Sequence, residues 1–227
     1  MEDDKINATI ETYNNIVDEY IDYFNSKDLN GNVQFQREID YIISQLQENA
    51  TILDVGTAIG DYPKFLTERC NKKFNVTGID TSENMLKQAI RNAPKAKFEL
   101  MDVRNMKFSK NSFDAIICFA TLIHIDDKTC LKVLDKFNEL LKPDGMIAIN
   151  VMEHIRDEKE IFIKEPFNPK YKTYFNRYSK QFFIDYFTKN NYTIEKIYDN
   201  KLFNEENVGE DLPDTNQFTI IVKSNSL

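Results

Sequence analysis

The stretch "TILDVGTAIGDYPKFL", residues 51–66, holds the most informative spacing in the sequence. It begins with a strand-like apolar run, continues through Asp54, Gly56 and Gly60, and ends in a helical segment. The two glycines remove side chains that would keep a ligand away from the backbone, and the start of the following helix offers free N–H groups. A chain with only 6 glycines that places two of them here is predicted to form a binding turn for a large ligand.

Two classes of cofactor fit such a turn, namely dinucleotides and S-adenosylmethionine. The dinucleotide pattern G-x-G-x-x-G, counted from Gly56, needs glycine at position 58 and glycine or alanine at position 61, where the chain has Ala58 and Asp61. An acid at this helix end would repel a pyrophosphate. The pattern acid-x-G-x-G-x-G is matched by Asp54, Gly56 and Gly60, and Ala58 is the departure.

Two further acids follow strand-like runs. Asp80 ends "VTGID", and Asp102 follows "FELM". A carboxylate at a strand end can accept hydrogen bonds from both hydroxyls of a ribose, and each charge-assisted bond contributes on the order of 1.5–3 kcal/mol. Asp102 lies one strand further out, where an adenine amino group would reach. Acids at three consecutive strand ends therefore predict a site for an adenosine moiety.

These residues require a sheet whose strands run in the same direction. From residue 51 onward, short apolar runs alternate with helical stretches, which implies a parallel sheet covered on both faces. The fold class is therefore α/β, with a Rossmann-like, mostly parallel seven-stranded sheet and an antiparallel last strand. The predicted strands are 51–55, 74–79, 97–101, 113–119, 145–151, 192–198 and 218–223, and the predicted helices among them are 62–70, 83–92 and 127–141, the last after a cap at Asp126.

Segments outside this alternation are predicted to flank the site. Amphipathic helices occur within 7–26 and 33–46, separated by Asn30 and Gly31. The aromatic segment 152–178 interrupts the alternation after the fifth strand, where insertions lie above the carboxyl edge of a sheet. The predicted organisation is a single domain at 1–227, with a helical cap at 1–48, a cofactor-binding core at 49–151, a lid at 152–178 and the C-terminal part of the core at 179–227.

Together these features resemble the class I S-adenosylmethionine-dependent methyltransferases. The matching stretches are "ILDVGTAIG", "VTGIDTSENML", "FELMDVRNMKFSKNSFDAIICFATLIHI" and "LKPDGMIAI", in the order and spacing of that family. The R-x-S-x-x-x-F pattern at 177–183, followed by "YTIEKIY", is similar to the C-terminal part of members that act on small molecules. The resemblance extends from Thr51 to the C-terminus, and the early helices resemble the variable cap of the family.

The resemblance implies S-adenosylmethionine as the cofactor and a role for individual positions. The implied contacts are Asp54, Gly56, Thr57, Ala58 and Gly60 around the methionine part, Asp80, Thr81 and Met85 at the ribose, Asp102 and Val103 at the adenine, Phe119 or Ala120 near the sulfonium, and Tyr20 from the cap. Ala58 replaces the usual glycine. A non-glycine residue adopts a left-handed conformation at a cost of roughly 1–2 kcal/mol, so the loop is expected to depart from the family's geometry at Ala58.

His124, in "LIHI", is the candidate catalytic base. In the fold of this family it would lie just beyond the fourth strand and near the methyl group, and the ordinary pKa of an imidazole suits the role. A structural histidine with a local hydrogen bond is the alternative. Tyr13 and Tyr20 share one helical face, so core packing is the alternative to a role for Tyr20 in closing the site.

The aromatic residues of the predicted lid also have two interpretations. Tyr171, Tyr174, Phe175 and Tyr178 either line an acceptor pocket, where ring faces favour a cationic or planar substrate, or form the core of the lid itself. No metal site is predicted, because His154 lacks neighbours at the spacing of a metal-binding motif.

Composition limits the partners. The formal net charge of −8 and the pI near 5.0 disfavour binding to nucleic-acid phosphates or anionic lipid. The sequence also lacks the N/D-P-P-Y and Pro-Cys motifs that DNA-modifying enzymes use on a flipped base, so no nucleic acid partner is expected. The N-terminus lacks a signal-peptide pattern, and no apolar run is long enough for a membrane span, which predicts a cytoplasmic protein with no membrane partner.

The predicted function is transfer of a methyl group from S-adenosylmethionine to a small-molecule acceptor by in-line displacement, in which positioning of the acceptor supplies most of the catalysis. One alternative is a non-catalytic regulatory protein that binds S-adenosylmethionine. A weaker alternative is an NAD(P)-dependent oxidoreductase, against which Ala58 and Asp61 argue.

Overall fold

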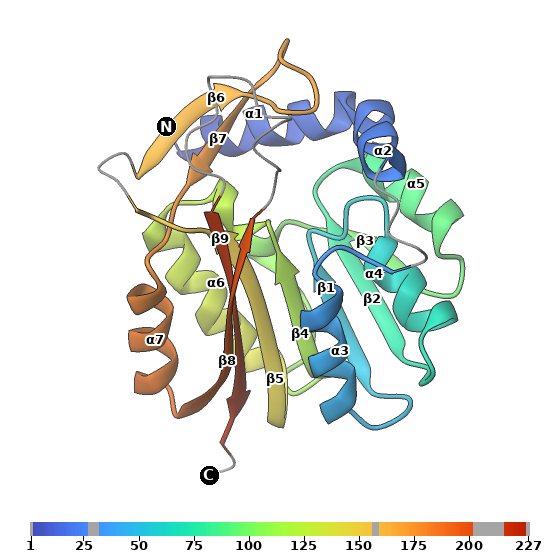
Figure 1. The fold of residues 1–227 in the computed structure, drawn as a ribbon, viewed down its shortest axis with the longest axis vertical. Coiled ribbons are helices and arrows are strands. Elements are labelled where there is room, and N and C mark those ends of the chain that lie inside the picture. Colours follow the sequence, from blue (N-terminus) through green and yellow to red (C-terminus); the bar gives the residue numbers. More distant parts are fainter. Residues whose placement is uncertain (1, 27–31, 156–158, 202–215, 226–227) are drawn as a thin grey trace.

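A seven-stranded sheet forms the centre of the computed structural model, which describes residues 2–26, 32–155, 159–201 and 216–225 (Figure 1). Its strand order is β3-β2-β1-β4-β5-β9-β8. Strands β1 to β5 are parallel, whereas β9 is antiparallel to both β5 and β8. This arrangement confirms the predicted fold class. The strands are β1 (Thr51–Val55), β2 (Asn75–Asp80), β3 (Lys97–Leu100), β4 (Phe113–Phe119), β5 (Leu141–Met152), β8 (Tyr192–Lys201) and β9 (Asn216–Ser224).

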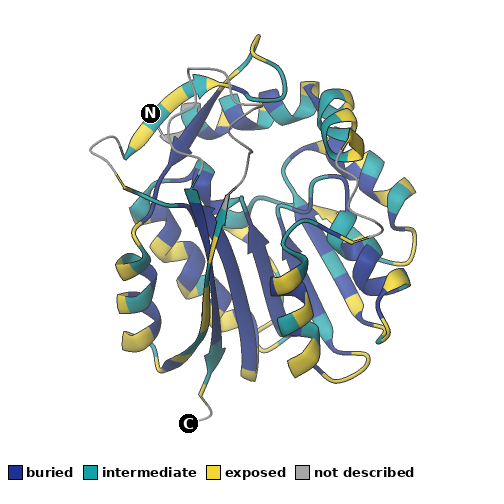
Figure 2. Ribbon diagram, in the orientation of Figure 1, coloured by how far each residue is buried: buried dark blue, intermediate teal, exposed yellow. Residues whose placement is uncertain are grey.

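Helices cover both faces of the sheet, whose central strands are buried (Figure 2). Alternate residues of β4 serve the two faces: Ile116 and Cys118 belong to a core with α6 and α7, whereas Ala115 and Ile117 belong to a core with α3. Burial on both faces is the reason why these strands are continuous apolar runs. The helices are α1 (Glu2–Asn15), α2 (Val17–Ser26), α3 (Gln36–Gln45), α4 (Asp61–Lys64), α5 (Glu83–Asn92), α6 (Asp127–Leu140) and α7 (Lys180–Lys189).

The helix predictions were right in place but not in every boundary. Helix α5 matches its prediction, and the Asp126 carboxylate caps α6 by accepting a hydrogen bond from the Thr129 N–H at 2.8 Å. The predicted helix 62–70 is α4 followed by a π-helical turn, Phe65–Arg69. The first N-terminal helix is interrupted at Ile16, whose side chain is fully buried. Helix α7 was not predicted.

The segment after β5 contains an antiparallel hairpin of β6 (Glu160–Lys164) and β7 (Lys172–Asn176), which the sequence patterns did not predict. A lone two-stranded hairpin is marginally stable in water, so it needs a partner. Helix α1 supplies one: Lys5 forms an ion pair with Glu160 at 2.7 Å and lies over the Tyr174 ring. Figure 1 shows α1 and the hairpin above the carboxyl edge of the parallel strands.

The predicted connection at Asn30 and Gly31 lies outside the described residues, and so do residues 202–215 between β8 and β9. Within the described ranges, no helix has both the length and the apolar character that a bilayer crossing requires.

Candidate active site

The turn after β1 contains three residues with positive φ: Gly56 (72°), Ala58 (46°) and Gly60 (79°). Ala58 thus adopts the left-handed conformation that its Cβ was expected to disfavour, and that expectation was wrong. The Ala58 N–H donates a hydrogen bond to Asp80 Oδ2 at 2.9 Å, which gives this conformation a partner on the neighbouring strand. The loop geometry implied by the family's glycine is therefore reached with alanine.

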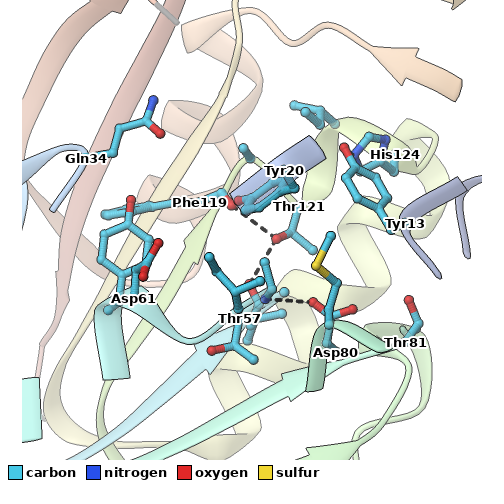
Figure 3. Close-up of a pocket in the computed structure, with 18 of the residues that line it drawn as sticks. Tyr13, Tyr20, Gln34, Thr57, Asp61, Asp80, Thr81, Phe119, Thr121 and His124 are labelled. Atoms are coloured by element: carbon cyan, nitrogen blue, oxygen red, sulfur yellow. Dashed lines mark hydrogen bonds between the residues drawn. The ribbon is translucent and has the colours of Figure 1, made fainter. Parts of the chain in front are cut away.

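Gly56 fits beside Thr121, which follows β4. A Cβ on Gly56 would lie 2.0 Å from Thr121 Oγ1. The Thr121 hydroxyl donates to the Val55 carbonyl at 2.9 Å, so the ends of β1 and β4 are joined where the strand order changes direction (Figure 3). Sequence reasoning missed Thr121, because nothing in its local pattern indicates a contact with residues 55 and 56. A crevice at this position is where open parallel sheets bind ligands.

Asp54 lies beneath the turn and does not face the cavity described below. Its side chain is buried, with 2% exposure, and accepts a hydrogen bond from the Thr57 hydroxyl at 2.6 Å. Burial raises the pKa of Asp54 to about 7; the Thr57 hydrogen bond opposes this rise, while the charges of Asp80 and Asp61 add to it. Gly60 also supports the turn, since a Cβ there would be 3.1 Å from the Ala89 side chain. Neither Asp54 nor Gly60 lines the cavity described below.

Asp80, at the end of β2, does line the cavity. Its Oδ1 accepts the Ser82 N–H at 2.9 Å, and its Oδ2 accepts the Ala58 N–H. Burial raises the pKa of Asp80, although the hydrogen bonds from Ser82, Ala58 and Thr81 oppose the rise. Because a carboxylate offers about four lone-pair positions and three backbone N–H groups approach it, Asp80 retains capacity for a further donor, such as a ribose hydroxyl.

Asp102, just after β3, lines the same cavity beside Val103. Its carboxylate is paired with Arg104: Oδ2 accepts Nε at 2.9 Å and Nη2 at 2.6 Å, and Oδ1 accepts the Arg104 N–H at 2.8 Å. Asp102 therefore comes to the predicted place with a cationic partner that sequence reasoning did not include. An adenine amino group would share this carboxylate with Arg104.

These strand ends open into a cavity of about 770 Å³ at the carboxyl edge of the sheet. That volume lies in the range of sites for cofactors and small molecules. Figure 3 shows Asp80 and Thr81 on one side of it, Asp61 on another, and Tyr20 with Phe119 across its middle. The predicted site residues that line the cavity are Gly56, Thr57, Ala58, Asp80, Thr81, Met85, Asp102, Val103, Phe119, Ala120, Tyr20 and His124.

His124 lies in the 3-10 turn η3 (Leu122–His124) and meets Tyr13 of α1. His124 Nδ1 lies 2.9 Å from the Tyr174 carbonyl oxygen, which can only accept, so Nδ1 carries the proton. Burial lowers the pKa of His124 to about 4, although the bond to Tyr174 opposes this, and the ring is neutral at pH 7. Nε2 is therefore an acceptor, and the Tyr13 hydroxyl, 3.3 Å away, donates to it.

The N-terminal helices and the hairpin close the cavity from above. Tyr20 of α2 packs edge-on against Phe167 of the lid with ring centroids 5.1 Å apart, and Asn168 Nδ2 donates to Glu19 Oε1 at 2.7 Å. The lid aromatics divide between the two interpretations given above: Phe175 lines the cavity, whereas Tyr178 is fully buried and its hydroxyl donates to the Ile125 carbonyl at 2.7 Å.

Two carboxylates in the cavity wall were not predicted as site residues, Asp61 and Glu165. Asp61 Oδ1 accepts a hydrogen bond from Asn92 Nδ2 at 3.1 Å, and burial raises its pKa. Asp61 follows Gly60 directly, so its position at the end of the turn could have marked it as a cavity residue. Glu165 lies in the lid between a strand and Pro166, where no spacing marks it as functional.

Comparison with known proteins shows what the strands around this cavity are similar to. A family model described as a methyltransferase domain matches residues 52–145. Phosphoethanolamine N-methyltransferase 3 of Arabidopsis thaliana is 35% identical over 108 residues, which are 46% of this chain and 21% of that protein. Demethylmenaquinone methyltransferase of Staphylococcus epidermidis is 33% identical over 106 residues, 45% of this chain and 43% of that protein.

The chain thus spans less than half the length of these curated relatives. A crystal structure of an S-adenosylmethionine-dependent methyltransferase from Methanosarcina mazei superposes with a TM-score of 0.66 at 18% identity, covering 82% of this chain and 98% of that one. At this low identity, the superposition supports the fold alone. The match to the family model, residues 52–145, covers the strands that surround the cavity. Through residues 52–145 the chain is similar to methyltransferase domains, and its fold is that of a solved S-adenosylmethionine-dependent methyltransferase.

Proposed function

We propose that the protein transfers a methyl group from S-adenosylmethionine to a small-molecule acceptor. One observation carries the proposal: a single cavity contains two regions. The first region is formed by the glycine turn after β1 and by the acids at the strand ends, and the second is formed by α1, η3 and the lid. The first region suits an adenosyl cofactor, and the second leaves room for an acceptor beside it. The names of the relatives, which include enzymes that act on phosphoethanolamine and demethylmenaquinone, support a small acceptor.

The residues present fit the cofactor. Asp80 has a lone pair left for a ribose hydroxyl, and the absence of a Cβ on Gly56 lets Thr121 approach the backbone closely. Asp102 and Val103 lie where the adenine would be, and Phe119 and Ala120 lie at the end of β4. When bound, the cofactor supplies an electrophilic methyl group on a sulfonium. The protein then has to hold an acceptor in line with that group and exclude water.

His124 is proposed to receive or orient a proton of the acceptor. Its Nε2 lone pair faces the Tyr13 hydroxyl at the cavity wall, and the bond from Nδ1 to Tyr174 fixes the ring orientation. A pKa of about 4 keeps Nε2 unprotonated throughout the physiological range. An acceptor hydroxyl or amine that displaces Tyr13 would find a hydrogen-bond acceptor at Nε2 without first removing a proton from it.

The cap and the lid are proposed to be parts of the same domain as the core. Their contacts support this: Asn168 bonds Glu19 between lid and cap, and Asn14 of α1 bonds Ser82 Oγ at 2.8 Å at the start of α5. Closure by these two elements would keep water from the sulfonium and order the acceptor. A protein that binds the cofactor without turnover would need the first region of the cavity alone, so the enclosed second region favours an enzyme.

Calorimetry and single-turnover assays test the proposal. The protein is titrated with S-adenosylmethionine and with S-adenosylhomocysteine, and methyl-labelled cofactor is incubated with pools of small-molecule acceptors. We expect binding of both forms and transfer of label. Asp80→Asn should weaken binding about tenfold or more, because a charge-assisted hydrogen bond contributes roughly 1.5–3 kcal/mol.

Asp114→Asn is the matched control. Asp114 lies at the opposite end of β4, where its Oδ2 accepts hydrogen bonds from the Thr51 N–H at 2.7 Å and from Lys142 Nζ at 2.8 Å, so its replacement should leave cofactor affinity unchanged. Binding without any transfer would support the regulatory alternative, and binding of NAD(P) in place of S-adenosylmethionine would support the oxidoreductase.

A further inference from the structure

A carboxylate without a cation lies in the wall of the cavity. Glu165, directly after β6, is 1% exposed and lines the cavity. Among the described residues, neither of its oxygens has a hydrogen-bond partner of good geometry. The Thr173 hydroxyl and the Phe167 N–H are near enough to favour the charged form, but burial has the larger effect and raises the pKa of Glu165 to about 7. The Thr173 hydroxyl itself also lacks a partner there.

Glu165 belongs to the end of the cavity that holds Tyr13 and His124. Burial, and next the charge of Glu165, raise the pKa of Tyr13 well above its ordinary value, which places the carboxylate within electrostatic reach of that hydroxyl. Figure 3 shows Tyr13 and His124 together at one side of the cavity, away from Asp61. We call this region the acceptor end. We define it as the part of the cavity wall contributed by α1, η3, β6, β7 and Glu165, which is Ile6, Thr9, Ile10, Tyr13, Ile123, His124, Ile163, Glu165 and Phe175.

The acceptor end is otherwise apolar or neutral. No lysine or arginine is among its lining residues in the described part of the chain; the basic residues in the cavity wall, Lys64, Arg69 and Arg104, belong to the elements after β1 and β3. A buried carboxylate left without a cation or a full set of donors is strongly unfavourable. A positively charged group on the ligand would remove that cost, and the rings of Tyr13 and Phe175 would favour the same charge.

We propose that the acceptor is an amine, and that Glu165 binds its ammonium group through the carboxylate at the acceptor end. The inference deepens the proposed function and rests on it. For transfer, the ammonium releases one proton to the Glu165 carboxylate, which passes it on to solvent. The nitrogen lone pair then forms the new N–C bond, and the electron pair of the broken C–S bond remains on sulfur. The methylated amine leaves as a cation, so one proton is released per turnover. Carboxylic acids are excluded as acceptors, because the Glu165 carboxylate would repel a second carboxylate.

Three probes with one skeleton test the proposal: phenethylamine, 2-phenylethanol and 3-phenylpropanoate. Each is titrated into protein saturated with S-adenosylhomocysteine, and each is offered as acceptor with methyl-labelled S-adenosylmethionine. We expect phenethylamine to bind at least tenfold more tightly than the alcohol, with methyl transfer to its nitrogen, and no detectable binding of the carboxylate. Equal or tighter binding of the alcohol or the carboxylate, or no binding of the amine, would overturn the proposal.

Variants tie the preference to Glu165. Glu165→Gln should bring the ratio of amine to alcohol affinity close to one, while Glu165→Asp should retain part of it. Glu160→Gln is the matched control, since Glu160 lies on the same hairpin but pairs with Lys5 on the outside. An unchanged ratio in Glu165→Gln contradicts the assignment. If that variant does not fold, the three probes on the native protein still decide the question.

The two proposals fail in different ways. Absence of S-adenosylhomocysteine binding to the native protein would remove the proposed function itself. Binding of S-adenosylhomocysteine together with transfer to an alcohol or an acid would leave the methyltransferase standing and remove the amine.

Discussion

At Asp54, burial raises the pKa to about 7, and at His124 burial lowers it to about 4. Both shifts favour the uncharged form of the group, as burial in a low-dielectric interior must. The two residues differ in what their neighbours do. Thr57 holds Asp54 under the turn, whereas Tyr174 holds His124 with its Nε2 toward the Tyr13 hydroxyl at the cavity wall. The protonation state of each residue can therefore be measured separately.

Asp54→Asn should become more stable relative to the native protein as the pH rises. The folded pKa of Asp54 lies above its unfolded value near 3.9, so the stability from its proton is complete below pH 4 and is lost as the pH rises through 7. Asparagine keeps the Thr57 contact and does not ionise. Urea unfolding between pH 5 and 7 should show the difference in unfolding free energy growing by about 1.4 kcal/mol per pH unit at most.

Asp114→Asn again serves as the control. Partial burial opposes the shift, but hydrogen bonds from Lys142 and Thr51 hold the pKa of Asp114 below its ordinary value. Its contribution to stability is lost only as the pH falls through that lowered pKa. The difference between Asp114→Asn and the native protein should therefore stay constant from pH 5 to 8. A constant difference for Asp54→Asn as well would contradict the assigned protonation.

The tautomer and charge of His124 can be read by NMR, because the chain contains only 2 histidines. We expect the imidazole signals of His124 to remain unchanged from pH 5.5 to 8, with an unprotonated Nε2, because the pKa is about 4. His154→Gln assigns the spectrum by difference. A midpoint near 6.5 for His124 would show a solvated ring and would remove the basis for its proposed role.

At the scale of elements, α1 connects parts of the protein that the sheet does not. Its Asn14 side chain accepts from Ser82 Oγ at 2.8 Å, and its Asn14 carbonyl accepts from Asn84 Nδ2 at 2.9 Å. At its other end, Lys5 pairs with Glu160 of the hairpin. Helix α1 therefore joins α5 to the lid, and its residues Ile6, Thr9, Ile10 and Tyr13 line the cavity.

Asn14→Ala should speed the release of the cofactor product. The variant loses the two hydrogen bonds that Asn14 Oδ1 accepts, from Ser82 Oγ and from the Asn84 N–H at 3.3 Å, and keeps the bond to its backbone carbonyl. Each lost bond contributes about 0.5–1.5 kcal/mol to the closed position, so the dissociation rate of S-adenosylhomocysteine should rise roughly tenfold. Stopped-flow displacement measures that rate. Asn15→Ala is the control, because Asn15 is exposed and its Nδ2 bonds only within α1, to the Glu11 carbonyl at 2.7 Å. Equal rates in both variants would show that α1 does not limit release.

For the whole molecule, the cavity lies at the carboxyl edge of the parallel strands, and no described residue of α7 or β8 lines it. Parallel strands end at the same edge, so the turn after β1, Asp80 and Asp102 meet although they are far apart in the chain. The antiparallel pair β9 and β8 extends the sheet beyond β5 and completes the core without adding to the cavity wall among the described residues. Cofactor binding should therefore affect the molecule unevenly.

Hydrogen exchange with and without saturating S-adenosylhomocysteine tests this. Amides that exchange by local opening should gain protection at 53–62, 80–85, 101–104 and 119–125 and in the two N-terminal helices, because these segments line the cavity. Helix α7 and strand β8 should change little. Protection concentrated in α7 or β8, with none around the turn after β1, would place the ligand elsewhere.

The sequence alone was sufficient for the sheet, for most helices and for the position of the binding edge. Periodicity and helix caps are local, as the match of α5 and the cap at Asp126 show. The hairpin β6–β7 and helix α7 were not predicted, because the aromatic residues of 152–189 follow neither the helical nor the strand period clearly. The glycines and the strand-end acids were found because the chain direction of a parallel sheet already decides which ends meet.

Tertiary structure decided which way each side chain points and what it meets. Asp54 turns beneath the loop toward Thr57, although its spacing resembled that of a ligand-binding acid. Tyr13 meets His124 across 111 residues of sequence, and Glu165 reaches the acceptor end from a hairpin that α1 supports. Such pairings depend on the packing of distant segments and on the burial that results, and no local pattern of residues records either.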